Sequence, residues 1–494
     1  MNLGTVAEIH HGRTVRCFSD RPRDLNTLFA LAVDTVGERL AIVCAQHRYS
    51  YGALEQRVNT LSRTLLEAGA ERGHRVLIRM ANGSDYLAAL LAVWRLGAIA
   101  VPHNIREGPR EIEHVLADSG AHLALCDAAH MLTGLLKCID VATVGLVNCG
   151  GIVPVECDED DVAVLLFTSG TTGRAKGVIL THLNIIHSCL HYRTGLGLID
   201  GERGLLSVPA SHVTGLVAIL ATMLACRGTT IALETFTAAG FHDAALREQM
   251  TYTLMVPAMY ALCLRDSIAL ESLTGWRVAG FGGAPMPLAT LESFTSRLPR
   301  LAFSNVYGAT ETASPATIMP AGETAARLTS VGRAVACGNV CIDSATGEIM
   351  LAGPHVSPGY WGDREATAAA FVDGFWRSGD VGRLDAEGFL FLSDRIKDMI
   401  NRGGYKIYSV EVEHVLAEHA FIVEAAVVGV PCDILGQRIR AIVVLLPGMS
   451  IDLAAARVHV GAHLADYKRP DELVVCDGPL PRNAAGKVLK SALR

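Results

Sequence analysis

The sequence contains no long apolar run that is free of charge, and it begins without the apolar core of a signal peptide. The most membrane-like stretch, from Tyr86 to Pro102, contains Arg95 and is short for a membrane span. A buried helix followed by a strand is the expected structure there. These absences predict a soluble, cytoplasmic protein with no transmembrane segment.

Cysteine is present but is not arranged in metal-binding pairs. The thirteen cysteines include no CxxC pair, and no second ligand pair follows Cys337 and Cys341. His414 and His419 lie beside acidic residues without the HExxH spacing, so we interpret them as part of a solvated helix face. The pattern predicts reduced thiols and no zinc site.

An excess of positive charge is also missing. The chain has 43 Lys and Arg against 50 Asp and Glu, for a formal net charge of -7, so nucleic acid is not an expected partner. Aromatic residues make up only 6% of the chain, but half of it is hydrophobic and 19% is charged. This balance can fill large cores and is not typical of a disordered protein.

With 494 residues, the chain is too long for a single core, so at least two domains are expected. Helical segments alternate with apolar runs such as 75–80 and 98–103, which predicts a mostly parallel sheet. A second such series is predicted to begin near Val162. Short strands separated by turns follow after about residue 330 and predict antiparallel sheet. We predict an α/β fold with domain 1–394 and a small α+β domain 395–494.

The strongest local signal is a glycine-rich loop that follows an apolar strand. Glycines let backbone N–H groups converge on anionic oxygens, hydroxyls add donors, and a lysine adds positive charge, so the loop can hold a polyphosphate. Its spacing is not that of the Walker A loop, and Gly280–Gly283 is not a dinucleotide fingerprint because Pro285 replaces the third glycine. The loop residues are Thr168, Ser169, Gly170, Thr171, Thr172, Gly173 and Lys176.

This loop resembles the phosphate-binding signature of the adenylate-forming superfamily, which includes acyl- and aryl-CoA synthetases, firefly luciferase and the adenylation domains of peptide synthetases. Ala175 stands where that signature usually has proline, and Asn483 where threonine is more common. Further matching motifs follow in the superfamily's order: Phe281-Gly-Gly-Ala-Pro285, Tyr307-Gly-Ala-Thr-Glu311, Trp376-Arg-Ser-Gly-Asp380, Ser393-Asp-Arg-Ile-Lys-Asp398, Asn401-Arg-Gly-Gly-Tyr-Lys406 and Pro481-Arg-Asn-Ala-Ala-Gly-Lys487.

The resemblance implies a fold and an activity. The large part would hold two mostly parallel sheets with helices and a small antiparallel, barrel-like unit, and a hinge would join it to the C-terminal domain. The enzyme would activate a carboxylic acid with ATP and Mg²⁺, form an acyl-adenylate and pass the acyl group to coenzyme A. A homodimer is compatible with the sequence, which does not fix the oligomeric state.

The resemblance also assigns roles to single residues. Tyr307 can stack on adenine and Glu311 can ligate Mg²⁺, because a hard cation prefers oxygen. Lys487, Thr310, Glu311 and Lys176 form the catalytic group. Besides the loop, the ATP-binding set is Gly283, Ala284, Pro285, Tyr307, Gly308, Thr310, Asp380 and Arg395. Lys397 matches the hinge, and Gly403 and Gly404 match the turn beside the thiol tunnel. The candidate partners for the phosphates of CoA are Arg402, Lys406, Arg438 and Arg440.

The acid pocket is predicted from His212, Val213, Gly282 and Gly308. Amino-acid-activating relatives commonly place an aspartate near His212, and its absence favours an aliphatic or aryl acid without an amino group. A packed histidine that caps a helix is an equally acceptable interpretation of His212. Two other functions stay open: a ligase that loads the thiol of a carrier protein, and a catalytically inactive nucleotide-binding regulator.

Overall fold

The computed structural model describes residues 4–132, 134–145, 150–169, 174–264, 267–482 and 488–494. The chain divides into two compact units. The first consists of Met1–Val340, Leu351–Trp376 and Gly388–Leu390, and the second of Cys341–Met350, Arg377–Glu387 and Phe391–Arg494. The boundary at residue 394 therefore stays a prediction. In the described part of the chain, no helix combines the length and apolar character that a membrane span needs.

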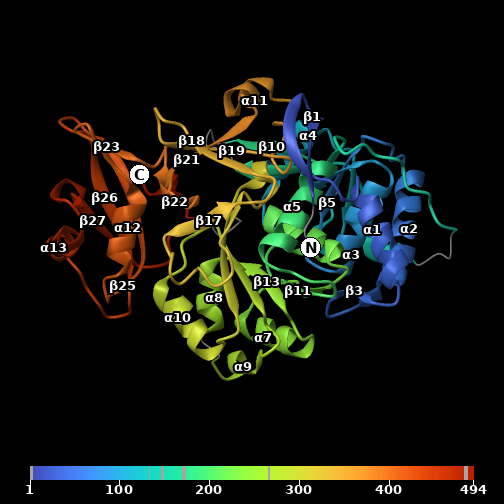
Figure 1. Cartoon of the computed structure of the whole chain (residues 1–494), viewed down its shortest axis with the longest axis horizontal. Helices are drawn as coiled ribbons and strands as arrows, with labels where there is room; N and C mark the ends of the chain where they lie inside the picture. The colour runs from blue at the N-terminus through green and yellow to red at the C-terminus, as the bar shows by residue number, and fades with distance from the viewer. Residues whose placement is uncertain (1–3, 133, 146–149, 170–173, 265–266, 483–487) are drawn as a thin grey trace. The chain divides into compact units, whose positions relative to one another are not determined.

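The first unit opens with a hairpin and a mixed sheet (Figure 1). Strands β1 (Thr5–His10) and β2 (Arg13–Phe18) form the antiparallel hairpin. The sheet has the order β10-β9-β6-β5-β7-β8 and is parallel except for β10. Its strands are β5 (Arg75–Arg79), β6 (Ile99–Pro102), β7 (Leu123–Cys126), β8 (Lys137–Asp140), β9 (Val162–Ser169) and β10 (Ala175–Thr181).

Helices enclose this first sheet. They are α1 (Leu25–Val36), α2 (Tyr51–Glu67), α3 (Ser84–Arg95), α4 (Pro109–Ser119) and α5 (His182–Gly195). Every residue of α3 except Asp85 is buried, which confirms the buried helix and strand predicted for Tyr86–Pro102. Helix α5 begins at a capping box, in which the Asn184 N–H donates to Thr181 Oγ1 and the Thr181 N–H donates to Asn184 Oδ1.

A second sheet runs through the same unit in the order β17-β16-β15-β14-β13-β11-β12-β3-β4. Its strands are β3 (Leu40–Val43), β4 (Arg48–Ser50), β11 (Arg203–Leu206), β12 (Thr229–Ala232), β13 (Tyr252–Met255), β14 (Val278–Phe281), β15 (Ala302–Tyr307), β16 (Thr317–Ile318) and β17 (Ser330–Ala334). The run from β3 to β15 is parallel, and β16 and β17 are antiparallel.

Helices connect or follow the strands of the second sheet along the chain. They are the π-helix η3 (Thr214–Ala221), α6 (Thr222–Ala225), α7 (Ala238–Arg247), α8 (Pro257–Cys263), α9 (Ser267–Ser272), α10 (Leu288–Arg297) and the 3-10 turn η4 (Thr310–Thr312). Figure 1 shows α7 to α10 gathered beside β13. Tyr260 of α8, Phe294 of α10 and Trp276, which lies between α9 and β14, are buried in one core with β14 and β15.

One strand assignment differs from the sequence-based expectation, and another was not predicted. The second series was predicted to begin near Val162, but β9 and β10 complete the first sheet, and the second series begins at β11. Strands β3 and β4 precede the first sheet in the chain, but they belong to the second sheet, because β3 pairs with β12. Hydrophobic periodicity identifies a strand but not its partner, which is chosen by packing between distant segments.

The second unit is built mainly from antiparallel strands and two helices. Parts of β18 (Asn339–Ile342), β19 (Glu348–Ala352), β21 (Phe375–Leu384) and β22 (Phe389–Arg395) belong to it, whereas α11 (Arg364–Ala370) and β20 (Phe371–Val372) belong to the first unit. β18 ends the ladder without a second neighbour among the described strands. The antiparallel region is therefore an open sheet and not the barrel-like unit we expected, since a barrel needs its end strands to pair.

The C-terminal segment of the second unit forms its own sheet, in the order β24-β23-β26-β25 with β27 parallel to β26. Its elements are β23 (Ile400–Arg402), β24 (Tyr405–Ile407), α12 (Ser409–Ala417), β25 (Ile422–Cys432), β26 (Gly436–Leu445), α13 (Leu453–His463) and β27 (Glu472–Cys476). Both helices contribute to one hydrophobic core with β25 and β26. The large α/β part and the small α+β part were both predicted.

Buried histidines join the N-terminal hairpin to the rest of the first unit. The Phe18 N–H donates to His187 Nε2 at 3.2 Å, and the rings of Phe18 and His187 are stacked. His191 and His355 make an edge contact with ring centroids 5.1 Å apart. Burial lowers the pKa of His187 and of His355 to about 3 and that of His182 to about 4. These histidines are therefore neutral in the folded chain at neutral pH.

Candidate functional site

The phosphate-loop motif lies between two strands of the first sheet. β9 and β10 form an antiparallel hairpin in which Thr168 is opposite Lys176 and Ser169 is opposite Ala175. Gly170, Thr171, Thr172 and Gly173 lie outside the described residues. The hairpin therefore presents both ends of the loop at one edge, and this arrangement differs from the strand-to-helix geometry of a Walker A loop.

The next motif begins where β15 ends. Tyr307 is the last residue of β15, and Thr310 and Glu311 lie in the short turn η4. Gly308 admits no side chain, because a Cβ atom there would lie 1.5 Å from the Ser314 carbonyl oxygen. Ala313 and Ser314 both adopt positive φ angles, which are uncommon outside glycine. This tight turn buries Thr310 and leaves Glu311 partly accessible.

Glu311 is held by a segment that we did not single out from the sequence. The Tyr360 hydroxyl donates to Glu311 Oε1 at 3.0 Å, and the Ser357 N–H donates to the Glu311 carbonyl at 2.8 Å. The centroid of the Tyr360 ring also lies 5.0 Å from the Lys176 Nζ atom. Burial, and then the Glu311 carboxylate, raise the pKa of Tyr360, so its hydroxyl stays protonated and remains a donor. A carboxylate in this position suits a hard cation such as Mg²⁺.

The predicted adenine-side loop follows β14, the parallel neighbour of β15. Gly282 comes directly after β14, and a Cβ atom there would lie 2.4 Å from the Val306 carbonyl oxygen. Gly283 has a φ of +78°, and Ala284 and Pro285 follow it. Two glycines are therefore required for backbone reasons where the chain leaves the sheet. Carboxyl ends of neighbouring parallel strands are common positions for ligand sites in α/β folds.

His212 lies just before the π-helix η3, and Val213 beside it is buried. His212 is exposed to solvent, yet desolvation by the surrounding protein lowers the pKa of its ring. The Thr214 N–H donates to Nδ1 at 3.2 Å. Because Nδ1 accepts this bond, neutral His212 carries its hydrogen on Nε2 and can offer it to a ligand.

The remaining predicted residues of the described chain lie in the second unit. Arg395 Nε lies 3.2 Å from Asp380 Oδ1, so the two predicted ribose-binding residues form an ion pair. Lys397 is exposed, and its pKa is lowered by desolvation and by the nearby Arg395. Gly403 and Gly404 have φ angles of +60° and +91°. Glycine adopts such positive angles without steric cost, which explains why two glycines stand at this turn.

The candidate cations for CoA are mostly paired. Arg402 Nη2 lies 2.8 Å from Asp471 Oδ1, and Arg440 Nε lies 2.6 Å from Glu472 Oε2. Arg438 forms an ion pair with the same Glu472. Lys406 is exposed. These pairs reduce the positive charge that this face can offer to phosphates. Lys487, the predicted catalytic lysine, and Asn483 lie outside the described residues.

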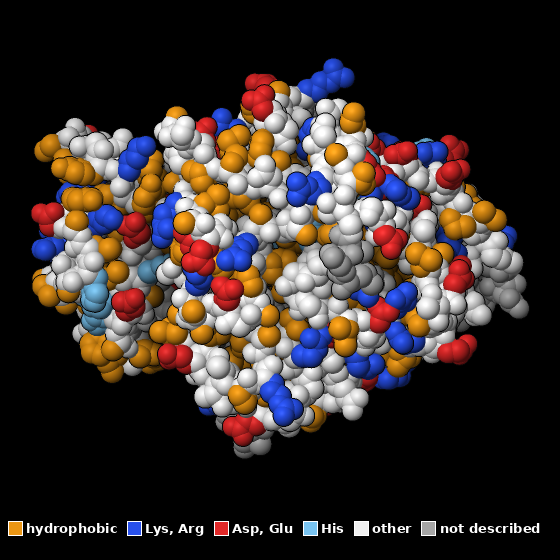
Figure 2. Space-filling view, viewed as in Figure 1, with side chains coloured by type: hydrophobic (Ala, Val, Ile, Leu, Met, Phe, Trp, Pro, Cys, Tyr) orange, Lys and Arg blue, Asp and Glu red, His pale blue; other side chains and the backbone are white. Residues whose placement is uncertain are grey.

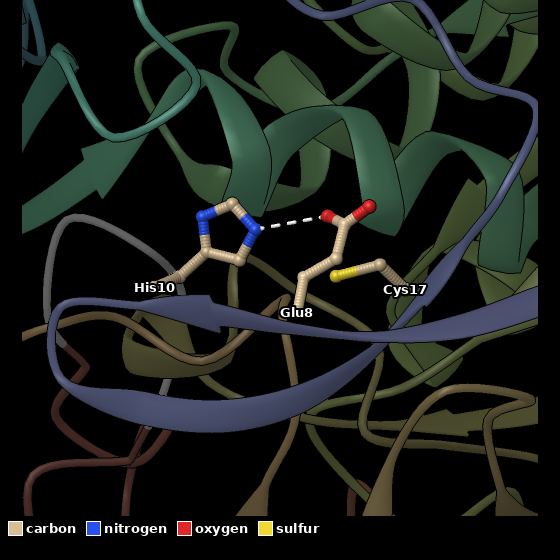
Figure 3. A group of neighbouring side chains, drawn as sticks. All are labelled: Glu8, His10 and Cys17. Atoms are coloured by element: carbon tan, nitrogen blue, oxygen red, sulfur yellow. Dashed lines mark hydrogen bonds and ion pairs between the residues drawn. The ribbon is translucent and has the colours of Figure 1, made fainter.

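One group of possible metal ligands lies apart from these residues. Glu8, His10 and Cys17 have ligand atoms within 4.8 Å of one another on β1 and β2 (Figure 3). Arg21 is hydrogen-bonded to Glu8 and lowers the pKa of that carboxyl to about 2, while burial raises the pKa of the Cys17 thiol to about 12. His10 Nδ1 is 2.9 Å from Asp160 Oδ1. A group whose acid is paired with arginine and whose thiol stays protonated stabilises the hairpin and does not suit a cation.

Family models match most of the chain. The AMP-binding enzyme model covers residues 29–361, and the model of the AMP-binding enzyme C-terminal domain covers residues 411–487. The chain belongs to the AMP-binding enzyme family. The superfamily resemblance is thereby confirmed, whereas the hairpin β1–β2 lies before the matched range.

Three relatives of this family member are named as CoA ligases or synthases. It is 33% identical over 470 residues to a feruloyl-CoA synthase of Amycolatopsis, covering 90% of this chain and 93% of that one. It is also 33% identical over 472 residues to the 2-succinylbenzoate–CoA ligase of Geobacillus kaustophilus, covering 92% and 95%. A Mycobacterium tuberculosis CoA ligase for a methyl-dioxo-octahydroindenyl propanoate is 32% identical over 507 residues, covering 95% and 99%.

Solved structures share the fold of this family member. The o-succinylbenzoate CoA synthetase of Bacillus subtilis with its acyl-adenylate intermediate matches at a TM-score of 0.87 and 27% identity, covering 96% of this chain and 98% of that one. The same enzyme with ATP and a magnesium ion matches at 0.87 and 27%, covering 96% and 100%.

On the face drawn in Figure 2, the positive and negative side chains of this family member are interspersed.

Proposed function

We propose that the chain is an AMP-forming acid–CoA ligase that makes an acyl-adenylate and pyrophosphate and then transfers the acyl group to coenzyme A. The observation that carries the proposal is the group of Glu311, Tyr360 and Lys176 at the end of the phosphate-loop hairpin. It supplies a carboxylate for Mg²⁺ and a cation for phosphate in a chain of the AMP-binding family. The three relatives named above are CoA ligases.

In the first half-reaction the acid needs no general base, because carboxylic acids titrate near ~4 and are ionised at neutral pH. The barrier is the approach of two anions. Lys487 and the loop hydroxyls, with Thr310 at the α-phosphate, would offset that repulsion. Tyr307 would stack on adenine, and the Asp380–Arg395 pair would contact the ribose. Mg²⁺ held at Glu311 would supply further positive charge.

In the second half-reaction the C-terminal domain, 395–494, would turn about Lys397. A charged hinge residue stays solvated in both orientations while its backbone torsions change. The turn at Gly403 and Gly404 would then border the pantetheine passage. Lys406 is the preferred candidate for a phosphate contact, since the three arginines are paired with Asp471 and Glu472. A homodimer is an additional proposal.

The acid is proposed to be an aryl or alicyclic acid that carries an oxygen beyond its carboxylate. His212 offers a neutral N–H donor, and no acidic side chain stands beside it in sequence to hold an ammonium group. The relatives act on feruloyl, succinylbenzoyl and dioxo-octahydroindenyl acids. We also propose a cytoplasmic location, supported by free thiols at all twelve described cysteines.

The test is an acid panel with ATP and Mg²⁺, scored by ATP–pyrophosphate exchange and then by acyl-CoA formation. Oxygenated aryl and alicyclic acids should give exchange and thioester, whereas fatty acids and amino acids should give little of either. If acyl-AMP accumulates and a holo carrier protein is acylated in place of CoA, the carrier-loading alternative replaces this proposal. If no acid supports exchange, the inactive-regulator alternative does.

A further inference from the structure

We propose that Tyr360 is a positioning residue for adenylation, because one side chain fixes both the proposed Mg²⁺ ligand Glu311 and the proposed phosphate cation Lys176. The inference rests on the proposed function. The Tyr360 hydroxyl donates to Glu311 Oε1 at 3.0 Å, and the centroid of the Tyr360 ring lies 5.0 Å from Lys176 Nζ. The role assigned to Tyr360 is positioning, so its effect passes through these two neighbours.

The backbone holds Tyr360 in place independently of its side chain. The Ile179 N–H donates to the Gly359 carbonyl at 3.1 Å, and the Trp361 N–H donates to the Gly177 carbonyl at 2.7 Å. Residues 359–361 thus pair with β10, the strand that carries Lys176, and Val178 is bridged to Tyr360. The distance from the ring to Lys176 is therefore set by strand pairing.

The same segment fixes Glu311 from two sides. The Ser357 N–H donates to the Glu311 carbonyl, while the Tyr360 hydroxyl holds the carboxylate. Ser357 Oγ in turn donates to the Ile179 carbonyl of β10 at 2.7 Å. A metal-binding carboxylate is normally oriented by such a donor, and loss of the donor weakens metal binding.

The N-terminal hairpin supports this segment as well. The Arg13 guanidinium donates to the Val356 carbonyl at 3.1 Å and to the Ser357 carbonyl at 3.3 Å. Arg13 is partly buried, and the hairpin that carries it precedes the range matched by the family model. The residues that hold Tyr360 therefore come from β2, β10 and the loop before α11.

The two contacts of Tyr360 can be separated by substitution. Tyr360→Phe keeps the ring beside Lys176 and removes the hydroxyl from Glu311, whereas Tyr360→Leu removes both. Tyr51→Phe is the matched control, because it deletes a buried hydroxyl that donates to the Gly228 carbonyl in another part of the unit. Circular dichroism and the Tm without ligand establish that each variant is folded.

The measurement is the rise in Tm with ATP over a Mg²⁺ titration, followed by ATP–pyrophosphate exchange with the best acid. Tyr360→Phe should need about tenfold more Mg²⁺ for half of the maximal Tm rise, and should recover wild-type ATP affinity at saturating Mg²⁺. Tyr360→Leu should also bind ATP more weakly at saturating Mg²⁺. The KM for the acid should not change in Tyr360→Phe.

A Tyr360→Phe variant with the Mg²⁺ dependence of the wild type would overturn the positioning role, even if exchange activity fell. Equal ATP affinities of the Phe and Leu variants at saturating Mg²⁺ would overturn the contact with Lys176. If ATP and Mg²⁺ do not raise the Tm of the wild-type chain at all, both this inference and the proposed function fail. The wild-type titration thus distinguishes the two kinds of failure.

Discussion

Single side chains of the site have separable tasks. Lys176 lies beside Tyr360 in the first unit, Glu311 presents a carboxylate, and Lys487 stands in the C-terminal motif outside the described residues. Only the first half-reaction brings two anions together. We therefore expect charge-removing substitutions to affect the two half-reactions unequally, which makes the assigned roles measurable.

Lys487→Ala should lower ATP–pyrophosphate exchange by about 10²–10³-fold, the usual effect of removing one preorganised group from a developing charge. Conversion of preformed acyl-AMP and CoA to thioester should be largely retained, because that step has no attack on phosphate. Lys137→Ala, which removes an exposed lysine, serves as the control. Equal losses in both half-reactions would contradict the role of Lys487.

Glu311→Gln should raise the Mg²⁺ concentration for half-maximal exchange by about tenfold or more, because a neutral amide replaces an anionic oxygen ligand. The amide oxygen can still accept from Tyr360, so the turn should stay folded. Exchange rates over a Mg²⁺ series measure the effect, and Glu365→Gln at an exposed position of α11 is the control. An unchanged Mg²⁺ response would rule out Glu311 as a ligand.

Among the secondary-structure elements, the π-helix η3 is unusual. Regular π-helices are rare and often occur at functional sites, and η3 extends over eight residues that begin two positions after His212. Its first turn is bonded to the histidine, since the Leu216 N–H donates to the His212 carbonyl at 2.9 Å. Thr222 Oγ1 donates to the Val217 carbonyl at 2.8 Å near the other end. The position of His212 therefore depends on this helix.

Gly215→Ala tests that dependence. A Cβ atom at this position would lie 2.3 Å from the Pro209 carbonyl oxygen, so the first turn of η3 must shift. We expect the KM for the acid to rise by about tenfold, corresponding to the lower end of the ~1–3 kcal/mol cost of overpacking, with the KM for ATP unchanged. Gly478→Ala, where an added Cβ has no neighbour within 4 Å, is the control. A parallel rise of both KM values would indicate general damage.

At the scale of the whole molecule, the buried histidines make stability depend on pH. The pKa values of His182, His187 and His355 lie near 3 or 4 in the folded chain, against 6.5 for an ordinary histidine, because burial disfavours the charged form. Below pH 6.5 the unfolded chain binds protons that the folded chain does not. The stability that these neutral, buried histidines contribute to the fold is complete above pH 6.5 and is lost as the pH falls toward the folded pKa values.

The free energy of unfolding should therefore decrease below pH 6.5 by up to about 1.4 kcal/mol per pH unit for each such histidine. Urea unfolding between pH 7.5 and 5 measures this slope. His355→Leu should make the dependence of the unfolding free energy on pH less steep by the contribution of one histidine. The control His47→Gln, at an exposed position, should leave that dependence unchanged. A variant slope equal to that of the wild type would contradict the assignment.

The sequence by itself determined the chemistry that is written in contiguous motifs. The glycine positions of the Tyr307–Glu311 turn and of the Gly403-Gly404 pair suit the backbone there, and they could be predicted because each motif lies within a few residues of sequence. The ligand roles of these motifs, and the phosphate loop between Ser169 and Arg174, stay predictions. The buried helix α3 and the α/β character followed from local periodicity. Family membership confirmed the adenylate-forming resemblance.

Only the tertiary structure decided which distant segments meet. Tyr360 contacts Glu311 across 49 residues of sequence because residues 359–361 pair with β10, and no local pattern encodes that pairing. The same holds for β3 and β4, which join the second sheet, and for Arg438 and Arg440, which both pair with Glu472 of β27. Local propensity and spacing act over a few residues, whereas strand partners and ion pairs are chosen by burial and charge across the whole fold.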